Sequence, residues 1–392
     1  KPDRVPVLIN VGSIPAYLYG LNYRTVSYDY ERLIETWERF NREYAVALDS
    51  YAMPQRIFPS RVLDILDYRQ YHWPGHGLPD DSRGYQYVEA EYMKADEYEA
   101  FIRDPSDFWL RTYLPRIFGA LEPFQSLKSL THIIELPMTD FMPLARPDIQ
   151  AALLVLVEAG KEFGRWMQAG KKALDKMTAS GYPVMRSTMA KAPFDTLGDT
   201  LRGTKGILLD MFRRPQKVLE AIDRITDLTI STVISSARAM KTIMVMFPLH
   251  KGADGWMNQK QFETFYWPSL KKVVQALVDE GLLVNLFAEG KYDSRLDSVN
   301  EFPKGSVCWW FDQTDMAEAK KKLGDRCCIQ GNVPTSLLVT GSPQEVKQYC
   351  RKLIETCASG GGYILCPAAS SDESRLENLL AMVEAAKEYG VY

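Results

Sequence analysis

The stretch "LLVNLFAEG" (residues 282–290) contains the pattern from which the fold can be predicted. A mostly apolar run of strand length ends at Ala288 and Glu289, and Gly290 and a series of charged residues follow. A short apolar run between turn signals is typical of a buried strand. The preceding segment, residues 258–281, has apolar residues at helical spacing and stops at Gly281, as helices often do.

The same strand and helix rhythm extends in both directions. Strands are expected at residues 242–250, 306–315, 326–332 and 361–369, with two more upstream at 44–52 and 182–190. Helices are expected between them and after them, at residues 293–302, 316–324, 342–359 and 374–390. Nearly continuous apolar strands that alternate with helices predict a parallel sheet covered by helices. A Rossmann sheet is the alternative, but no G-x-G-x-x-G follows any of these strands.

We therefore predict an α/β fold with a single (β/α)8 TIM barrel over residues 1–392. Regular βα units are expected over residues 180–392. Residues 1–125 are rich in Tyr and Pro and less regular, so they are expected to form a helical and loop extension that covers one end of the barrel.

Composition narrows the choice of partners. The net charge of −3 and the lack of a Lys/Arg-rich run argue against a nucleic-acid partner. No apolar run approaches the roughly 18 residues that a membrane span needs, and prolines interrupt the N-terminal region where a signal peptide would lie. All six cysteines fall in the last quarter of the chain, which indicates reduced thiols in a cytoplasmic protein rather than a disulfide framework.

Polar residues near the predicted strand ends are the candidate site, because barrel active sites lie at the C-terminal ends of strands. As catalytic residues we predict Glu289, His250 and Asp312. As zinc ligands we predict Glu289, His250 and Cys366. As substrate-binding residues we predict Asp49, Arg186, Trp310 and Asn332.

Each of these residues also has a purely structural alternative. His250 can hydrogen-bond a loop carbonyl, and Cys366 can be a packed thiol. Glu289 can pair with Lys291 or Arg295.

The C-terminal half resembles the uroporphyrinogen decarboxylase superfamily. The resemblance rests on four segments: "GADGWMNQKQFETFYWPSLKKVVQALVDEG", "AEG", "IQGNVPTSLLVTGSPQEV" and the closing "GGGYILCPAASSDESRLENLLAMVEAAKEYG". It covers about residues 180–392 well and implies a TIM barrel. One branch of the superfamily decarboxylates a porphyrinogen without a cofactor, and another transfers methyl groups together with corrinoid proteins.

This sequence departs from the motifs of both branches, and the departures help to choose between them. The decarboxylase pattern has an N-terminal Arg-Gln-Ala-Gly-Arg segment and a Gly-His-Gly on its last strand, and neither occurs here. Zinc-dependent methyltransferases of the superfamily carry His-x-Cys-Gly where this chain has Phe287, Ala288, Glu289 and Gly290. A thiolate site for activating a thiol is therefore not preserved. A carboxylate at this position suits polarisation or protonation of an ether oxygen.

The resemblance thus implies a methyltransferase of the O-demethylase type. It would move a methyl group from a small donor, with a methoxylated aromatic as the candidate, to a corrinoid protein, with zinc as the expected metal. The alternatives are a decarboxylase or lyase that acts on a small acid or porphyrinogen, and a non-catalytic tetrapyrrole or corrinoid binding protein. The resemblance also makes a homodimer the candidate assembly.

Overall fold

A computed structural model describes residues 2–54, 59–82, 84–129, 135–136, 138–183, 186–369 and 371–392. Its main sheet has six parallel strands, and each pairs with the next one along the chain. The strands are β4 (Ser187–Met189), β5 (Met244–Leu249), β6 (Leu283–Ala288), β7 (Val307–Phe311), β8 (Cys328–Val333) and β9 (Tyr363–Pro367). This order confirms the predicted α/β fold of the TIM-barrel type.

The N-terminal segment continues the sheet beyond β9. Leu8 N–H donates to the Leu365 carbonyl at 2.9 Å, and Leu365 N–H donates to the Pro6 carbonyl at 2.9 Å. Val7 and Leu365 form an isolated parallel bridge. Within the described residues the hydrogen-bonded ladder runs from β4 to this bridge and does not return to β4, so the expected eight-strand closure is not seen there.

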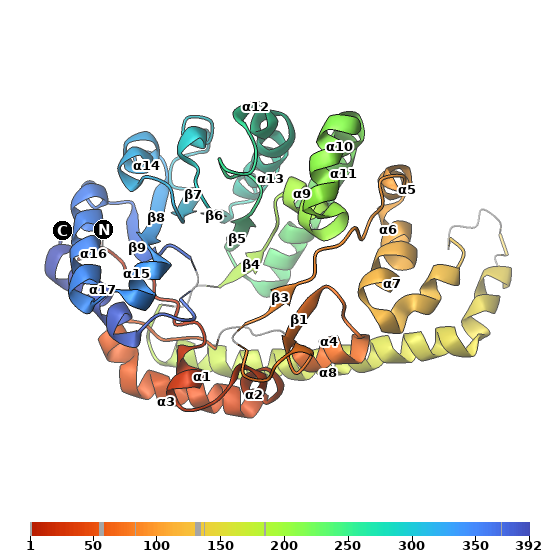
Figure 1. Cartoon of the computed structure of the whole chain (residues 1–392), viewed down its shortest axis with the longest axis horizontal. Coiled ribbons are helices and arrows are strands. Elements are labelled where there is room, and N and C mark those ends of the chain that lie inside the picture. Colours follow the sequence, from red (N-terminus) through yellow and green to blue (C-terminus); the bar gives the residue numbers. More distant parts are fainter. Residues whose placement is uncertain are drawn as a thin grey trace.

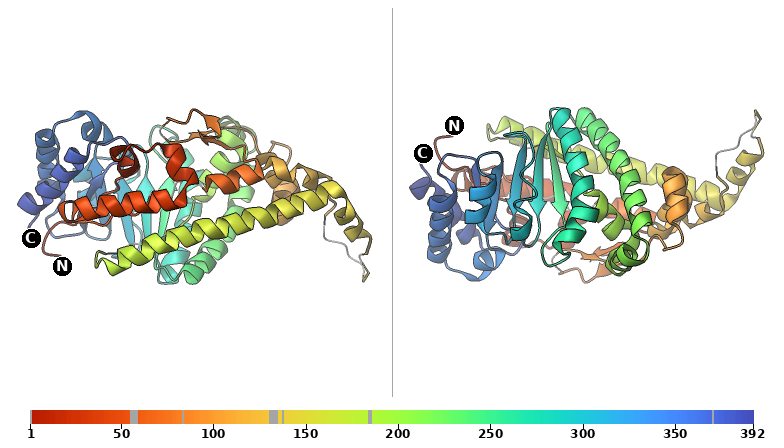
Figure 2. Two further views of the ribbon diagram at one scale, coloured as in Figure 1. Left: turned by 90° about the horizontal axis from the view of Figure 1, so that it is seen from below. Right: turned by 90° about the horizontal axis from the view of Figure 1, so that it is seen from above.

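Helices lie on both sides of this sheet (Figure 1). Those that connect or follow its strands are α9 (Pro193–Asp195), α10 (Gly203–Arg213), α11 (Pro215–Met240), α12 (Gln259–Gln261), α13 (Trp267–Asp279), α14 (Met316–Leu323), α15 (Thr335–Thr340), α16 (Pro343–Cys357) and α17 (Leu376–Tyr389). The view from below in Figure 2 shows two long N-terminal helices crossing the opposite side, α3 (Tyr30–Leu48) and α8 (Pro147–Ala179).

The N-terminal part adds short elements near one end of the sheet. Its helices are α1 (Ile14–Leu18), α2 (Tyr23–Tyr28), α4 (Ser60–Leu66), α5 (Tyr98–Arg103), α6 (Pro105–Phe108) and α7 (Leu114–Ile117). Its small sheet is made of β1 (Tyr71–Pro74), β2 (Gly77–Leu78) and β3 (Gln86–Tyr87). Tight 3-10 and π turns connect several of these helices and the later ones.

Burial alternates along the central strands. In β5 the side chains of Val245, Phe247 and Leu249 are completely buried, whereas those between them are only half-buried. Alternate residues of a strand point to opposite faces, so one face packs against helices and the other is more open. The more open face leads to His250 at the end of β5.

Two local predictions were wrong, and a third was confirmed only in part. Residues 44–52 do not form a strand, because α3 continues to Leu48. Its buried residues Leu33, Trp37, Phe40, Ala45 and Leu48 follow helical spacing over more than four turns, and this longer pattern overrides the local alternation. The helix expected at 293–302 is only a 3-10 turn over Asp293–Arg295. The strand expected at 182–190 is limited to β4 in the described chain, and residues 184–185 of that prediction lie outside the described residues.

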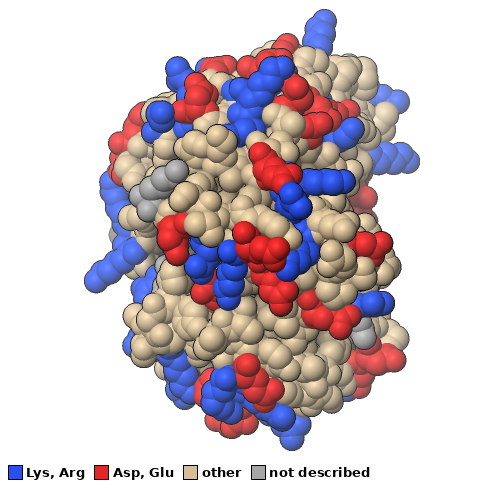
Figure 3. All heavy atoms as spheres, turned by 90° about the vertical axis from the view of Figure 1, so that its left-hand side faces the viewer, with Lys and Arg blue, Asp and Glu red and all other residues tan. Residues whose placement is uncertain are grey.

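Positive and negative charges are mixed on the surface. On the side of the molecule shown in Figure 3, Lys and Arg lie among Asp and Glu without a broad field of one sign. Pairs such as Lys347 with Glu388 and Arg351 with Glu355 contribute to this mixture. None of the helices in the described ranges combines the length and apolarity that crossing a membrane requires.

A buried ion pair ties the N-terminal part to the barrel. Arg202 and Asp210 are almost completely buried, and Arg202 Nε donates to Asp210 Oδ2 at 2.6 Å. The Tyr98 hydroxyl donates to the same oxygen at 2.9 Å, and Arg202 also donates to the Met93 carbonyl. Removal of the guanidinium would leave Asp210 Oδ2 buried without its closest cation, because Arg214 Nη1 contacts only the other oxygen, Oδ1, at 3.3 Å.

We predict that Arg202→Met lowers the free energy of unfolding by about 3–5 kcal/mol. Urea denaturation followed by circular dichroism measures this change. Arg238→Met is the matched control, because Arg238 is 72% exposed and pairs with Glu280 at the surface. The control should cost less than about 1 kcal/mol. Equal losses in the two variants would contradict this role of Arg202.

Candidate active site

The end of β5 is held by a completely buried carboxylate, Asp195 of α9. Its two oxygens accept the backbone N–H groups of His250 and Lys251, each at 3.0 Å. The Tyr266 hydroxyl donates to the same carboxylate at 2.8 Å. Burial, together with the nearby Asp199, raises the pKa of Asp195. These bonds fix the backbone at the residue from which the His250 imidazole projects.

Asp199 orients that imidazole. Its Oδ2 lies 2.6 Å from His250 Nδ1, and its two oxygens also pair with Lys191 Nζ at 2.8 Å and Lys251 Nζ at 2.9 Å. Burial alone would raise the pKa of Asp199, but the bond to His250 and the two lysines outweigh it and lower this pKa. Asp199 is therefore an ionised carboxylate surrounded by cationic groups.

The same contact acts on His250 in the opposite direction. Burial by itself would lower the pKa of His250, but the hydrogen bond and the charge of Asp199 outweigh it, and Asp195 and Glu289 add to the effect. The pKa of His250 is therefore raised, so this site favours the protonated imidazole. A carboxylate that holds one nitrogen leaves the other nitrogen free to face a substrate or a second acid.

Glu289 is that second acid. Its Oε1 lies 3.7 Å from His250 Nε2, and its side chain is 42% exposed at the end of β6. Burial is the main cause that raises the pKa of Glu289; Asp195 and Asp312 contribute, and His250 opposes them. The structural alternatives are not observed, because Lys291 pairs with Asp293 and Arg295 pairs with Asp254, both at 3.3 Å.

Asp312 and Asn332 shape the next part of the rim. Asp312 Oδ2 accepts the Gly290 N–H at 2.9 Å, which fixes the backbone just after Glu289. The Asn332 amide donates to the carbonyls of Asp312 and Thr314 at 3.1 and 2.9 Å. The amide of Asn332 therefore holds the loop after β7, which is a structural role rather than the predicted contact with a substrate.

An aromatic pair lies on the open face of the sheet, two residues before Glu289 on β6 and two residues before Asp312 on β7. The rings of Phe287 and Trp310 lie 4.1 Å apart between centroids, on neighbouring strands. Trp310 Nε1 donates to the Pro367 carbonyl at 3.0 Å, which leaves the ring faces for packing. Phe287 and Trp310 together offer an apolar floor below the polar rim.

Tyrosines of the N-terminal sheet approach the same rim. The Tyr87 hydroxyl donates to the Asp199 carbonyl, and the Tyr71 ring lies 5.2 Å from that of Tyr87 and 5.3 Å from that of Tyr85. Burial, followed by Tyr85 and Asp199, raises the pKa of Tyr71 to about 12. Glu289 is among the groups that raise the pKa of Tyr85, after burial and Asp372. These phenols therefore stay protonated at the rim.

The structure brings together the three predicted catalytic residues, His250, Glu289 and Asp312, on three successive strands. Asp49 and Arg186 lie elsewhere. Asp49 ends α3 in a left-handed conformation and pairs with Arg4. Arg186 precedes β4 and so lies at the opposite end of the strands, exposed to solvent.

Among the described residues, the three predicted zinc ligands do not gather into one group of side chains. In the described part of the chain, no group of three or more His, Cys, Asp and Glu side chains is arranged to hold a metal ion. Cys366 is buried, its Sγ donates to the Pro367 carbonyl at 3.2 Å, and burial raises the pKa of the thiol. A zinc ligand must be a thiolate, so this environment does not fit the role.

Three important residues were not predicted: Lys191, Asp195 and Asp199. The sequence signal was present, because "KAPFDTLGD" directly follows β4. The strand was predicted to end at residue 190, one residue past the observed end at Met189, but Arg186 within it was chosen as the candidate instead of the residues that follow the strand. A search of the residues after that strand would have found Lys191 at the rim and the two aspartates one helical turn apart.

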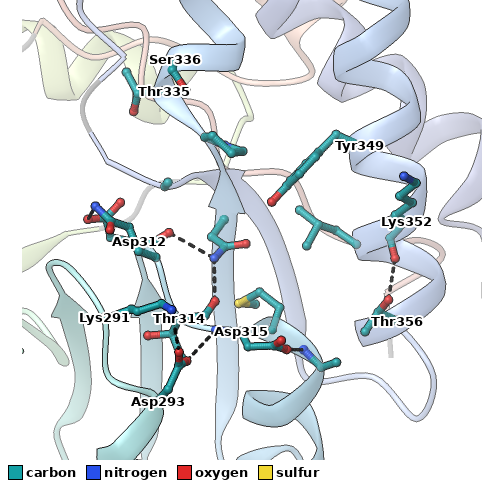
Figure 4. A pocket seen from close by; sticks show the side chains of 17 residues that line it. Lys291, Asp293, Asp312, Thr314, Asp315, Thr335, Ser336, Tyr349, Lys352 and Thr356 are labelled. Carbon is teal, nitrogen blue, oxygen red and sulfur yellow. Dashed lines mark hydrogen bonds and ion pairs between the residues drawn. The ribbon is translucent and has the colours of Figure 1, made fainter. Parts of the chain in front are cut away.

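A polar cleft of about 770 Å³ adjoins this site on the β7 and β8 side. Figure 4 shows Asp312, Lys291, Asp293 and Thr314 along one side of it, and Tyr349 and Lys352 of α16 along the other. Because Asp312 also bonds the backbone after Glu289, this cleft and the acid site share a wall.

Comparison with known proteins gives this geometry a family context. Residues 171–389 match the model of the uroporphyrinogen decarboxylase (URO-D) family. The uroporphyrinogen decarboxylase of Actinobacillus succinogenes is 22% identical over 266 residues, which cover 64% of this chain and 68% of that protein. The enzyme of Pseudoalteromonas translucida is 23% identical over 169 residues, only 39% of this chain and 43% of that protein.

A solved structure shares the fold over nearly the whole length. A methyltransferase from Methanosarcina mazei superposes with a TM-score of 0.61 at 14% sequence identity, covering 99% of this chain and 95% of that one. The family model spans more than half of the present chain. On this match, together with the shared fold, the chain belongs to the uroporphyrinogen decarboxylase (URO-D) family.

Proposed function

We propose that this protein is a methyltransferase that removes a methyl group from a small methyl ether, with a methoxylated aromatic as the donor, and passes it to a corrinoid protein. The observation that carries the proposal is the pair of proton-holding groups, His250 and Glu289, 3.7 Å apart at the rim. Both have raised pKa values, and both lie above the aromatic floor of Phe287 and Trp310.

The chemistry of an ether requires such a pair. When the bond between the methyl carbon and oxygen breaks, the bonding electrons stay on oxygen, and an alkoxide or phenoxide is a poor leaving group. A proton delivered to that oxygen as the bond breaks turns the leaving group into a neutral alcohol or phenol, which leaves readily. In our proposal the Glu289 carboxyl donates this proton, and His250, held by Asp199, then restores it. The corrinoid of the partner protein supplies the nucleophile that takes the methyl group.

The electrostatics of the rim disfavour a polycarboxylate substrate. Four carboxyl groups gather there, Asp195, Asp199, Glu289 and Asp312, whereas the nearby lysines are both paired with Asp199. Like charges brought together in a partly buried site repel strongly. A porphyrinogen that carries several carboxylates would need free cations here, whereas a neutral ether would not.

We assign no step to a metal, because the predicted ligand set does not assemble. Elemental analysis of the purified protein checks this assignment. Zinc at one atom per chain, lost together with activity on chelation and restored with it, would contradict a mechanism that relies on proton transfer alone.

Glu289→Gln should lower methyl transfer by about 100-fold or more, because the amide keeps the shape of the side chain but cannot donate the carboxyl proton. Glu289→Ala should have at least the same effect. The measurement is the rate at which the demethylated phenol appears in the presence of a reduced corrinoid acceptor. Glu301→Gln is the control, because Glu301 pairs with Lys271 at the surface. Full activity of Glu289→Gln would contradict the role of Glu289 as the proton donor.

Asp199→Asn should lower the pKa of His250, because the charge that favours the imidazolium is removed. Proton NMR titration of the His250 ring, assigned with His250→Asn, measures the change. The raised pKa stabilises the wild-type fold below the unfolded pKa of about 6.5, and this contribution is lost as pH rises through the folded value. An unchanged His250 titration in Asp199→Asn would show that the contact has no electrostatic effect.

The alternatives give different products from the same protein. Release of CO₂ from a porphyrinogen or a small acid, with no phenol from methoxylated aromatics, would identify a decarboxylase and overturn the proposal. Tight binding of a tetrapyrrole or corrinoid without turnover of either substrate would identify a binding protein instead.

A further inference from the structure

The polar cleft beside the acid site offers room that the proposed chemistry does not use. Its volume of about 770 Å³ is in the range of pockets that enclose a whole small molecule. Its described lining comes mainly from the loops after β6, β7 and β8 and from α14 and α16. Asp312 lines the cleft and also accepts the N–H of Gly290, the neighbour of Glu289. A group attached to a donor at the rim can therefore extend into the cleft.

The charge of the cleft disfavours an anionic ligand. Its described lining carries three acidic and two basic side chains: Asp293, Asp312, Asp315, Lys291 and Lys352. Lys291 Nζ pairs with Asp293 Oδ2 at 3.3 Å, so one of the two cations is already engaged. Three negative and two positive charges leave an excess of one negative charge, which opposes the entry of a carboxylate or a phosphate.

A cationic ligand is not required either, because backbone donors already stabilise two of these acids. Asp315 Oδ1 accepts the N–H groups of Ala317 and Glu318 at 2.8 and 3.1 Å, at the start of α14. Asp293 Oδ1 accepts the Asp315 N–H at 2.9 Å. The cleft therefore suits an uncharged ligand best.

Hydrogen-bond donors and acceptors are mixed along the cleft. Figure 4 shows the Tyr349 ring reaching from α16 into it. Burial, followed by Cys350 and Asp315, raises the pKa of Tyr349, so its hydroxyl keeps its proton and can donate. Thr314 Oγ1 accepts the Tyr292 N–H at 2.9 Å, and its own hydroxyl hydrogen can donate. A carboxylate oxygen accepts more than one hydrogen bond, so Asp315 can still accept from a ligand.

Apolar side chains lie among these polar groups. Met316 of α14, Leu353 of α16 and Pro334 after β8 line the same cleft. A sugar ring matches such a surface, because its hydroxyl groups both donate and accept without charge and its C–H faces pack against apolar and aromatic side chains.

Resting on the proposed function, we propose that the cleft binds an uncharged sugar attached to the aromatic ring of the donor, so that the protein acts on glycosides of methoxylated phenols. The ring that carries the methyl ether lies on the floor of Phe287 and Trp310, and the sugar extends past Asp312 into the cleft. There Tyr349 donates a hydrogen bond to a sugar hydroxyl, and Asp315 accepts one from another.

Isothermal titration calorimetry on the purified protein, without a corrinoid protein, tests the cleft apart from methyl transfer. The probes are the β-glucoside and the β-galactoside of para-methoxyphenol, and para-methoxyphenol itself. At least one glycoside should bind about 10-fold more tightly than the phenol, because the sugar adds hydrogen bonds and packing in the cleft. Binding of both glycosides no tighter than the phenol would overturn the proposal, as would tighter binding of para-methoxybenzoate than of either glycoside.

Tyr349→Phe removes only the hydroxyl that reaches into the cleft. It should weaken binding of the preferred glycoside by about 5- to 10-fold and leave the dissociation constant of the phenol unchanged. Tyr389→Phe is the matched control, because Tyr389 lies on α17 and its ring contacts Arg351. This control should change neither constant, and circular dichroism establishes that both variants are folded. An unchanged glycoside constant in Tyr349→Phe, or an equal loss for glycoside and phenol, would contradict the sugar site.

The sugar site and the proposed function can fail separately. Glycoside binding that follows this pattern, without methyl transfer to a reduced corrinoid acceptor, would support the sugar site and overturn the proposed function. Methyl transfer from para-methoxyphenol, with no tighter binding of either glycoside, would support the proposed function and overturn the sugar site.

Discussion

The buried carboxylate of Asp195 is the constraint on which the site depends. It accepts the N–H groups of His250 and Lys251 and the hydroxyl of Tyr266, so it ties α9, the end of β5 and the helix after it to one point. A completely buried acid is costly unless its oxygens are satisfied, and three donors satisfy these two oxygens. With the backbone fixed there, Asp199 one helical turn later reaches His250, and His250 reaches Glu289.

The rest of the rim supports the proposal of proton transfer at this site. At the positions where the zinc-dependent branch of the superfamily would have a His and a Cys, this chain has Phe287 and Glu289. Phe287 packs against Trp310 and adds an apolar surface, while Glu289 adds an acid whose pKa is raised mainly by burial. A potential metal site is thus replaced by an aromatic floor with a proton donor at its edge, which is the basis for proposing a methoxylated aromatic as the donor.

Much of the fold could be predicted from the sequence, because strands such as β6 and β7 are apolar runs bounded by turns and alternate with long amphipathic helices. The predicted ends of β5, β6 and β7 also placed His250, Glu289 and Asp312 at one rim, as the structure does. Predictions failed where the local pattern was short. At β4, Arg186 within the predicted strand was chosen as the candidate, so Lys191 and the two aspartates after the strand were missed. The first part of the strand predicted at residues 44–52 belongs to α3, which ends at Leu48. Cys366 has the right chemistry for a metal, but its burial could only be seen in three dimensions.

The central claim is that Glu289 keeps its proton at a pH where an ordinary glutamate has lost it. Difference infrared spectroscopy of the wild-type protein against Glu289→Gln, recorded over a pH series, isolates the carbonyl stretch of this one protonated carboxyl group. The account predicts that this band disappears with a midpoint clearly above 4.5, the usual value for glutamate. A midpoint at or below that value would contradict it, because Glu289 would then be a plain carboxylate with no proton to give.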